Sequence, residues 1–300
     1  MFGNRQAKST KKKPSGTFDN LPHLGVGLGL RRAIFEETME HRDQIDWLEI
    51  VPENHMGKGG RSIEMLEIAI DKGFPIVSHG VNLSIGSTDP LDTDYLSALK
   101  ALFKVVQPPW FSDHLCFASV GGTYLNDLVP LPFTKEAVRH VVKRIKAVQA
   151  QFDIPFLIEN VSYYAAFGSD EMTEAQFTSE VLEGADCGLM LDVNNIYVNA
   201  QNHGYDAFAF LDQIPLERTI QIHIAGHLRQ KRLIVDTHGA SVCDEVWDIL
   251  EAVLKRVPVK GILLERDNNI PPLPELLDEL AQIHRVVDKA AGAKLEAVST

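Results

Sequence analysis

Three short apolar runs decide the fold: PFLIENV (155–161), GLMLDVN (188–194) and TIQIHIA (219–225). Each run has the length of a buried strand and carries a polar side chain near its carboxyl end, namely Glu159, Asp192 and His223. These three residues follow one another at intervals of 33 and 31 residues, which matches one strand–helix–strand unit. The region therefore predicts consecutive parallel strands joined by helices.

The same alternation extends in both directions along the chain. We expect eight buried strands, at Leu24–Leu30, Asp46–Pro52, Pro75–Asn82, Trp110–Phe117, Pro155–Val161, Gly188–Asn194, Thr219–Ala225 and Val259–Arg266. Helical periodicity predicts amphipathic helices between them, among others at Ser62–Lys72, Thr134–Gln151, Ser241–Arg256 and Pro274–Ala290. This pattern favours an α/β fold of the (β/α)₈ TIM-barrel type, although an open doubly wound sheet stays possible. The glycines of GVGLG (25–29) do not form a GxGxxG fingerprint, which weakens a dinucleotide-binding alternative.

Composition indicates a globular protein with one main domain. Apolar residues make up 45% of the chain and charged residues 23%, and the formal net charge of −12 argues against general nucleic-acid binding. We expect a basic, disordered tail at 1–20, one catalytic barrel at 21–292 and a flexible end at 293–300. No apolar stretch is long enough to span a membrane, and three scattered cysteines fit a reducing compartment. A cytoplasmic location is therefore expected.

Polar side chains that can bind metals gather at the carboxyl ends of the expected strands. They are Glu49, Glu53, Asn54, His55, His79, Asn82, Asp113, His114, Glu159, Asn160, Asp192, Asn194, Asn195, His223, His227, Asp236, His238, Glu265 and Asp267. In a barrel these ends meet at one face, where barrel enzymes place their active sites. Asp236 and His238 are two positions apart on an extended stretch, so both could reach one ion.

So many carboxylates at close range repel one another unless cations neutralise them. Oxygen and imidazole donors without thiolates suit iron, manganese or zinc, and the number of donors exceeds what one ion needs. A single histidine at a barrel rim is more often a packing residue, and Glu–Asn or Asp–Asn pairs often cap helices. These simpler interpretations explain the joint pattern poorly, so we expect a metal site with several ions.

Several sequence segments together resemble a known enzyme family. They are GVGLGLR, WLEIVPENHMG, SHGVNLSIGS, SDHLCF, LIENVSYY, LDVNNIYVNA, IHIAGH, DTHG and LLERD, which occur in this order over about residues 21–270. The chain resembles the multinuclear non-heme iron-dependent oxidative enzymes, a family that includes the oxygenase subunit of methanobactin biosynthesis. It is also distantly similar to the xylose isomerase-like TIM barrels and to the trinuclear-zinc endonuclease IV barrel.

The resemblance implies a ligand set and a chemistry. The implied metal ligands are His79, His114, Glu159, Asp192, His223, Asp236, His238 and Glu265, with Asn195 as a further ligand. His55, Asn82 and Asn160 would line the catalytic pocket, and we add Asp113 to these candidate catalytic residues. The implied cofactor is iron, as two or three ions, with zinc or manganese as possible substitutes. The implied reaction uses O2 to modify a residue, which we expect to be cysteine, of a ribosomally made precursor peptide, with a small partner protein that grips the leader segment.

Other functions fit the same donor set. A divalent-metal sugar isomerase or epimerase would need no oxygen. A zinc-dependent phosphodiester hydrolase would use similar ligands, but the acidic balance counts against it. A non-catalytic, metal-dependent binding module would leave the open barrel mouth unexplained.

Overall fold

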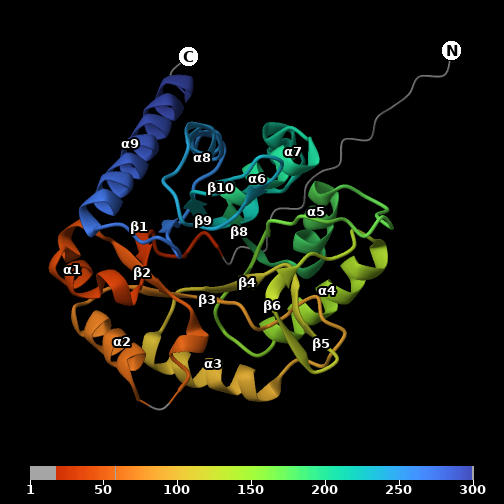
Figure 1. Cartoon of the computed structure of the whole chain (residues 1–300), viewed down its shortest axis with the longest axis horizontal. Helices are drawn as coiled ribbons and strands as arrows, with labels where there is room; N and C mark the ends of the chain where they lie inside the picture. Colours follow the sequence, from red (N-terminus) through yellow and green to blue (C-terminus); the bar gives the residue numbers. More distant parts are fainter. Residues whose placement is uncertain (1–17, 58, 299–300) are drawn as a thin grey trace.

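The computed structural model describes residues 18–57 and 59–298 and contains a closed barrel of eight parallel strands (Figure 1). This confirms the expected (β/α)₈ barrel. In order around the barrel the strands are β1 (Gly25–Gly29), β12 (Gly261–Glu265), β9 (Thr219–Ala225), β8 (Gly188–Asp192), β7 (Phe156–Glu159), β4 (Phe111–His114), β3 (Ile76–Gly80) and β2 (Trp47–Ile50). The ring closes where β1 pairs with both β2 and β12.

Helices surround the barrel and cover the outer faces of its strands (Figure 1). They are α1 (Phe35–Glu40), α2 (Arg61–Asp71), α3 (Thr93–Val106), α4 (Lys135–Gln149), α5 (Glu174–Ala185), α6 (Val193–His203), α7 (Ala207–Gln213), α8 (Asp244–Arg256) and α9 (Leu273–Val298). Thr134 begins α4 as expected, because its hydroxyl accepts the Ala137 amide hydrogen bond. Short 3₁₀ turns lie at η1 (Arg32–Ile34), η2 (Arg42–Gln44), η3 (Pro52–Asn54) and η4 (Leu216–Arg218).

Two hairpins interrupt the regular alternation at the barrel mouth. The run expected as one strand at Trp110–Phe117 ends as β4 at His114, and the chain then forms an antiparallel hairpin of β5 (Phe117–Val120) and β6 (Thr123–Val129). A smaller hairpin, β10 (Leu228–Arg229) with β11 (Ile234–Val235), follows β9. Both hairpins connect a barrel strand to the next helix, so they extend the face that carries the strand ends.

The barrel interior is built in two layers, one apolar and one polar. The apolar layer is a buried cluster that includes one residue from each of six strands or strand entries: Trp47, Val77, Trp110, Leu157, Met190 and Leu263. Two positions further along the same strands lie buried polar residues: Glu49, His79, Ser112, Glu159, Asp192 and Glu265. Since strand side chains alternate between faces, residues two apart point to the same side. The period of the strand thus places the donors directly above an apolar floor.

Glycine on β1 makes room for the largest side chain in this floor. Trp47 is fully buried, and its indole N–H donates to the Gly25 carbonyl oxygen at 3.3 Å. A Cβ atom added at Gly27 would lie 2.4 Å from the Trp47 ring. Gly27 therefore serves packing inside the barrel.

The N-terminal end of the described chain packs against the barrel. Phe18 is buried and belongs to the apolar floor cluster, and α9 continues to Val298. The expected basic tail lies mostly outside the described residues, so the domain boundaries at 20 and 292 stay predictions. Within residues 18–57 and 59–298, no helix combines the length and apolar character needed to cross a bilayer.

Replacement of Gly27 by alanine should destabilise the barrel. The added methyl group would overlap the Trp47 ring, and overpacking of this kind costs about 1–3 kcal/mol. Chemical unfolding followed by circular dichroism measures the change in the free energy of unfolding. Gly292→Ala on α9 is the matched control, because a Cβ there meets no other atom. Equal stability of the Gly27→Ala variant and the wild type would contradict the layered packing.

Candidate metal centre

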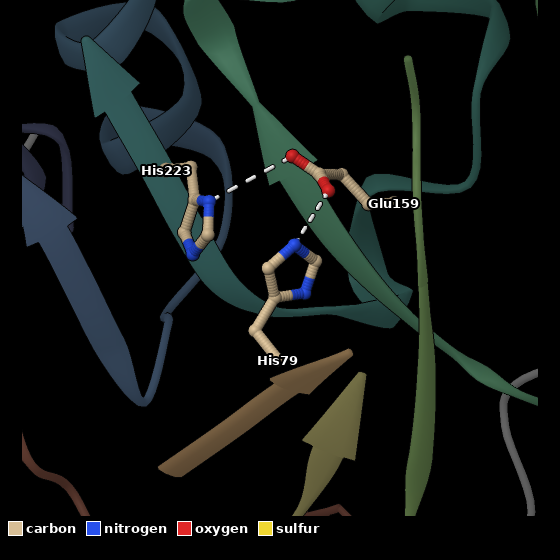
Figure 2. Close-up of side chains that lie close together, drawn as sticks. All are labelled: His79, Glu159 and His223. Atoms are coloured by element: carbon tan, nitrogen blue, oxygen red, sulfur yellow. Dashed lines mark ion pairs between the residues drawn. The ribbon is translucent and has the colours of Figure 1, made fainter. Parts of the chain in front are cut away.

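The first donor group joins three strands that are far apart in sequence. His79 on β3, Glu159 on β7 and His223 on β9 each offer one ligand atom, and these atoms lie within 4.8 Å of one another. Figure 2 shows that each imidazole faces a different oxygen of the Glu159 carboxylate, with His79 Nε2 3.2 Å from Oε2 and His223 Nδ1 3.7 Å from Oε1. His114 on β4 adds a third imidazole, with Nε2 2.9 Å from Oε2. All four side chains are buried.

The second donor group combines two strand ends with a loop. Asp192 on β8, Glu265 on β12 and His238 offer ligand atoms that also lie within 4.8 Å of one another. Glu265 contacts both groups, since its Oε2 is 3.0 Å from His223 Nδ1 and its Oε1 is 3.4 Å from His238 Nδ1. Asp236 lies beside this group, with Oδ1 2.8 Å from His238 Nε2. The expected ligands therefore converge into two adjacent clusters.

The donor atoms of these clusters meet the test for a missing cation. Two buried ligand atoms, Asp192 Oδ2 and Asn195 Oδ1, have no hydrogen-bond partner. Four more buried atoms contact only other members of the same ligand set: Glu159 Oε2, His223 Nδ1, His238 Nε2 and Glu265 Oε2. Buried polar atoms without a partner cost free energy, and native proteins usually satisfy them. All six belong to side chains of the ligand set implied by the sequence. The residues present therefore fit a metal centre with oxygen and imidazole ligands.

The surroundings of the centre shift the pKa values of its carboxyl groups in opposite directions. Burial disfavours the charged form of Glu159, but His114 and His79 outweigh it and hold the pKa of this carboxyl below its usual range. Burial likewise opposes protonation of His114, yet the Glu159 carboxylate raises the pKa of His114 to about 9. For Asp192, burial and the nearby Glu159 charge both raise the pKa. Without a metal ion, protons must therefore neutralise part of this cluster.

Outer partners fix the orientation of each strand-borne imidazole. His79 Nδ1 lies 2.9 Å from Ser112 Oγ, and His114 Nδ1 lies 3.1 Å from the Gly80 carbonyl oxygen. His223 Nε2 lies 3.1 Å from Glu49. Such partners set which imidazole nitrogen faces the metal.

Glu49, which the sequence placed among the candidate donors, forms a chain of hydrogen bonds with Gln221 and Trp110, two residues that sequence reasoning left out of the site. Trp110 Nε1 donates to Gln221 Oε1 at 2.6 Å, and Gln221 Nε2 donates to Glu49 at 2.6 Å. Gln221 precedes His223 by two residues and shares its face of β9. The sequence feature that could have identified Gln221 is a polar residue inside an otherwise apolar strand.

Asparagines hold the Asp192 segment in place. Asn160 accepts a hydrogen bond from the Asp192 amide at 3.0 Å and donates to its carbonyl oxygen at 2.9 Å. The Asn195 amide donates to Asp192 Oδ1 at 2.6 Å, while the Asn195 side-chain oxygen has no partner. Asn160 therefore links the end of β7 to β8 through two hydrogen bonds. The side-chain oxygen of Asn195 remains available as a ligand.

The other candidate catalytic residues take different positions. His55 is buried beside the pocket, its Nδ1 has no hydrogen bond, and burial lowers its pKa. The Asp113 carboxylate accepts backbone hydrogen bonds from His114 and Leu83, and burial raises its pKa to about 6. Asn82 is exposed and donates its backbone N–H to Glu53. Of these three residues, only His55 lines the pocket described next.

An open pocket of about 540 Å³ leads to the donor groups. Its walls come from the end of β1, the η3 turn, strand β6 of the β5–β6 hairpin and the loop after β12. Its floor includes His79, His114, His238 and Glu265. Tyr124 and Asn126 of β6 form one side, and Arg31 and Arg32 line the pocket as well. Pockets of this size commonly take a small ligand or a side chain of a larger one.

The loop after β7 contacts Asp236 and is anchored by a partly buried glutamate, Glu174. Tyr164 Oη accepts the Asp236 amide hydrogen bond at 2.9 Å. The base of the loop is held by Asn199, which accepts from the Tyr163 amide and donates to Glu174. Tyr205 also donates to Glu174, and burial raises the pKa of Glu174 to about 7.

Glu174→Gln should change how stability depends on pH. The folded-state pKa of about 7 lies above the ordinary glutamate value of 4.5, so the protonated carboxyl stabilises the fold at low pH. That contribution is lost as pH rises from about 4.5 through about 7. Relative to Glu174→Gln, the wild type should therefore lose stability between pH 5 and pH 8, as measured by denaturant unfolding. Glu183→Gln, an exposed position on the same helix, serves as control. A difference between wild type and Glu174→Gln that stays constant over this range would refute the assignment.

Comparison with known proteins agrees with this architecture. A family model described as "RiPP precursor modification enzyme MbnB/TglH/ChrH" matches residues 25–288. A UPF0276 protein of Anaeromyxobacter sp. (strain Fw109-5) is 46% identical over 270 residues, covering 90% of this chain and 95% of the relative. A UPF0276 protein of Shewanella sediminis is 48% identical over 264 residues, covering 86% and 93%.

Solved structures show the same barrel with little sequence identity. The 3-keto-D-glucoside 4-epimerase YcjR from E. coli superposes with a TM-score of 0.55 at 14% identity, covering 87% of this chain and 99% of the epimerase. An L-ribulose 3-epimerase gives a TM-score of 0.55 at 14% identity, covering 95% and 96%. These neighbours confirm the TIM barrel, and at this identity they show the fold alone. The family match, in contrast, spans the barrel with its donor groups, and the chain belongs to the family of RiPP precursor modification enzymes MbnB/TglH/ChrH.

Proposed function

We propose that this protein is a multinuclear non-heme iron enzyme that uses O2 to oxidise a residue of a ribosomally made precursor peptide. The observation that carries the proposal is the convergence of six buried ligand atoms at the mouth of the barrel, two without any hydrogen-bond partner and four that contact only other members of the ligand set. Membership in a family that modifies such peptides supports the substrate class. We expect the modified residue to be cysteine.

Two ions would occupy the two donor groups. His79, Glu159 and His223 would hold the first ion, and His114 lies close enough to Glu159 to contribute. Asp192, His238 and Glu265 would hold the second ion, with Asp236 and Asn195 beside them. A third position would have to use these additional donors. When bound, iron would supply one-electron redox chemistry with dioxygen; zinc or manganese could occupy the same ligands.

The protein's own residues prepare the pocket for a peptide side chain. Leu30, Val51 and Met65 give the pocket apolar wall area, which limits the access of water to a bound side chain. Glu265 lies at the pocket floor and contacts the histidines of both donor groups. A substrate group that enters the pocket therefore meets both groups at once. We also propose a small partner protein that binds the leader segment, as in the family that the sequence resembles.

Metal content provides the first test. Wild-type protein purified without oxygen and loaded with Fe2+ should retain at least two ions per chain, measured by inductively coupled plasma mass spectrometry. Glu159→Gln should lose the ion of the first group, because glutamine cannot supply the charge that offsets the cation. His284→Gln is the control, since His284 is half exposed and lies outside the mouth. Unchanged iron content in Glu159→Gln would refute the ligand assignment.

Oxygen dependence provides the second test. Iron-loaded protein and a cysteine-containing precursor peptide encoded beside its gene should give a product of altered mass only when O2 is present, measured by mass spectrometry. The expected partner protein is added in a parallel reaction. The same product formed without oxygen would exclude the oxidase. A colourless zinc protein that hydrolyses phosphodiesters would favour the hydrolase alternative. A manganese protein that epimerises sugars would favour the epimerase alternative.

A further inference from the structure

The two donor groups differ in how their histidines are held. In the first group, His79 and His223 lie on barrel strands, as does the adjacent His114, and these strands are hydrogen-bonded on both sides. In the second group, His238 lies in the loop between β11 and α8. Its backbone φ is +48°, a left-handed conformation that non-glycine residues adopt only when surrounding contacts enforce it. The second group therefore depends on contacts that fix this loop.

Asp267 supplies the main contacts to His238. The Asp267 amide donates to the His238 carbonyl oxygen at 3.0 Å, and the His238 Nδ1–H donates to Asp267 Oδ2 at 3.0 Å. With Nδ1 directed at Asp267, Nε2 is the imidazole nitrogen that remains for a cation. Nε2 lies 2.8 Å from Asp236 Oδ1, which belongs to the same candidate ligand set. Asp267 thus selects both the position and the binding nitrogen of His238.

Arg31 in turn holds Asp267 from the opposite side. Its Nε donates to Asp267 Oδ1 at 3.1 Å, and its Nη2 forms an ion pair with the same oxygen. This leaves Oδ2 for His238, so one carboxylate connects the guanidinium to the imidazole. The Arg31 side chain is only 19% exposed, and it lies over Gly29 at the end of β1. A Cβ atom at Gly29 would come within 2.8 Å of the guanidinium carbon.

We infer that Arg31 and Asp267 are positioning residues that set the affinity of the second donor group for its metal ion. The inference rests on the proposed function, because it takes Asp192, His238 and Glu265 as metal ligands. It adds that contacts at the rim of the pocket affect the affinity for the second ion but not the affinity for the first. The first ion depends on the barrel strands alone, and the second depends on a salt bridge that crosses from β1 to the loop after β12.

Titration of metal-free protein with Co2+ under argon tests this directly, with visible absorbance and calorimetry as readouts and neither peptide nor oxygen present. Asp192→Asn first identifies which binding step belongs to the second group. Arg31→Met and Asp267→Ala should then weaken that step about 10- to 100-fold, the usual effect of losing an outer partner of a ligand, while the other step stays unchanged. Gly29→Ala should weaken the same step although it removes no charge, because it displaces the guanidinium.

Arg32→Met is the matched control, because Arg32 is the exposed neighbour that lines the same pocket and carries the same charge. It should leave both steps unchanged. Equal losses of metal affinity in Arg32→Met and Arg31→Met would mean that only the net charge of the pocket matters, and would overturn the inference. Wild-type metal affinity in Arg31→Met and Asp267→Ala would also overturn it. Equal weakening of both steps would also overturn it. If the wild type binds no Co2+, the proposed function itself fails, and the inference fails with it.

Discussion

The structure depends on one buried carboxylate. Glu159 lies in the middle of the barrel mouth and contacts His79, His114 and His223, which come from three other strands. Transfer of such a charge from water into a protein interior is costly unless positive charge accompanies it. Protonated imidazoles can provide that charge in the metal-free protein, and a cation can provide it in the loaded protein. The rest of the site can be understood as the arrangement that keeps these groups together.

The barrel geometry explains how so many polar groups are buried without loss of the fold. His79, Glu159, Asp192 and Glu265 each follow an apolar floor residue by two positions, so an apolar layer lies beneath these polar side chains. Closure of the ring shields the donors from bulk water on all sides except the mouth. Trp47 fills the floor only because β1 presents glycine at position 27. The same strands therefore supply both the apolar floor and the charged donors above it.

Loops complete what the strands begin. His238 and Asp236 belong to a segment after the β10–β11 hairpin, and contacts from Asp267, Tyr164 and Asn194 hold that segment against the mouth. Strand-borne ligands are rigid by virtue of the sheet, whereas loop-borne ligands need partners of their own. This difference makes the second donor group the part of the centre that the surroundings can tune.

The sequence by itself determined the barrel and most of the donor set. Strand-length apolar runs at regular spacing specify parallel strands, and Glu159, Asp192, His223 and Glu265 each end such a run, so their meeting at one face follows from strand direction alone. Only the tertiary structure decided which donors lie within reach of one another, that Asn160 links β7 to β8, and that Asp113 accepts hydrogen bonds from backbone amides. The hydrogen bond between Gln221 and Glu49 and the ion pair between Arg31 and Asp267 also emerged only there. The physical reason is that these contacts join side chains across the ring, at distances set by closure and rotamer, and sequence spacing carries no information about either.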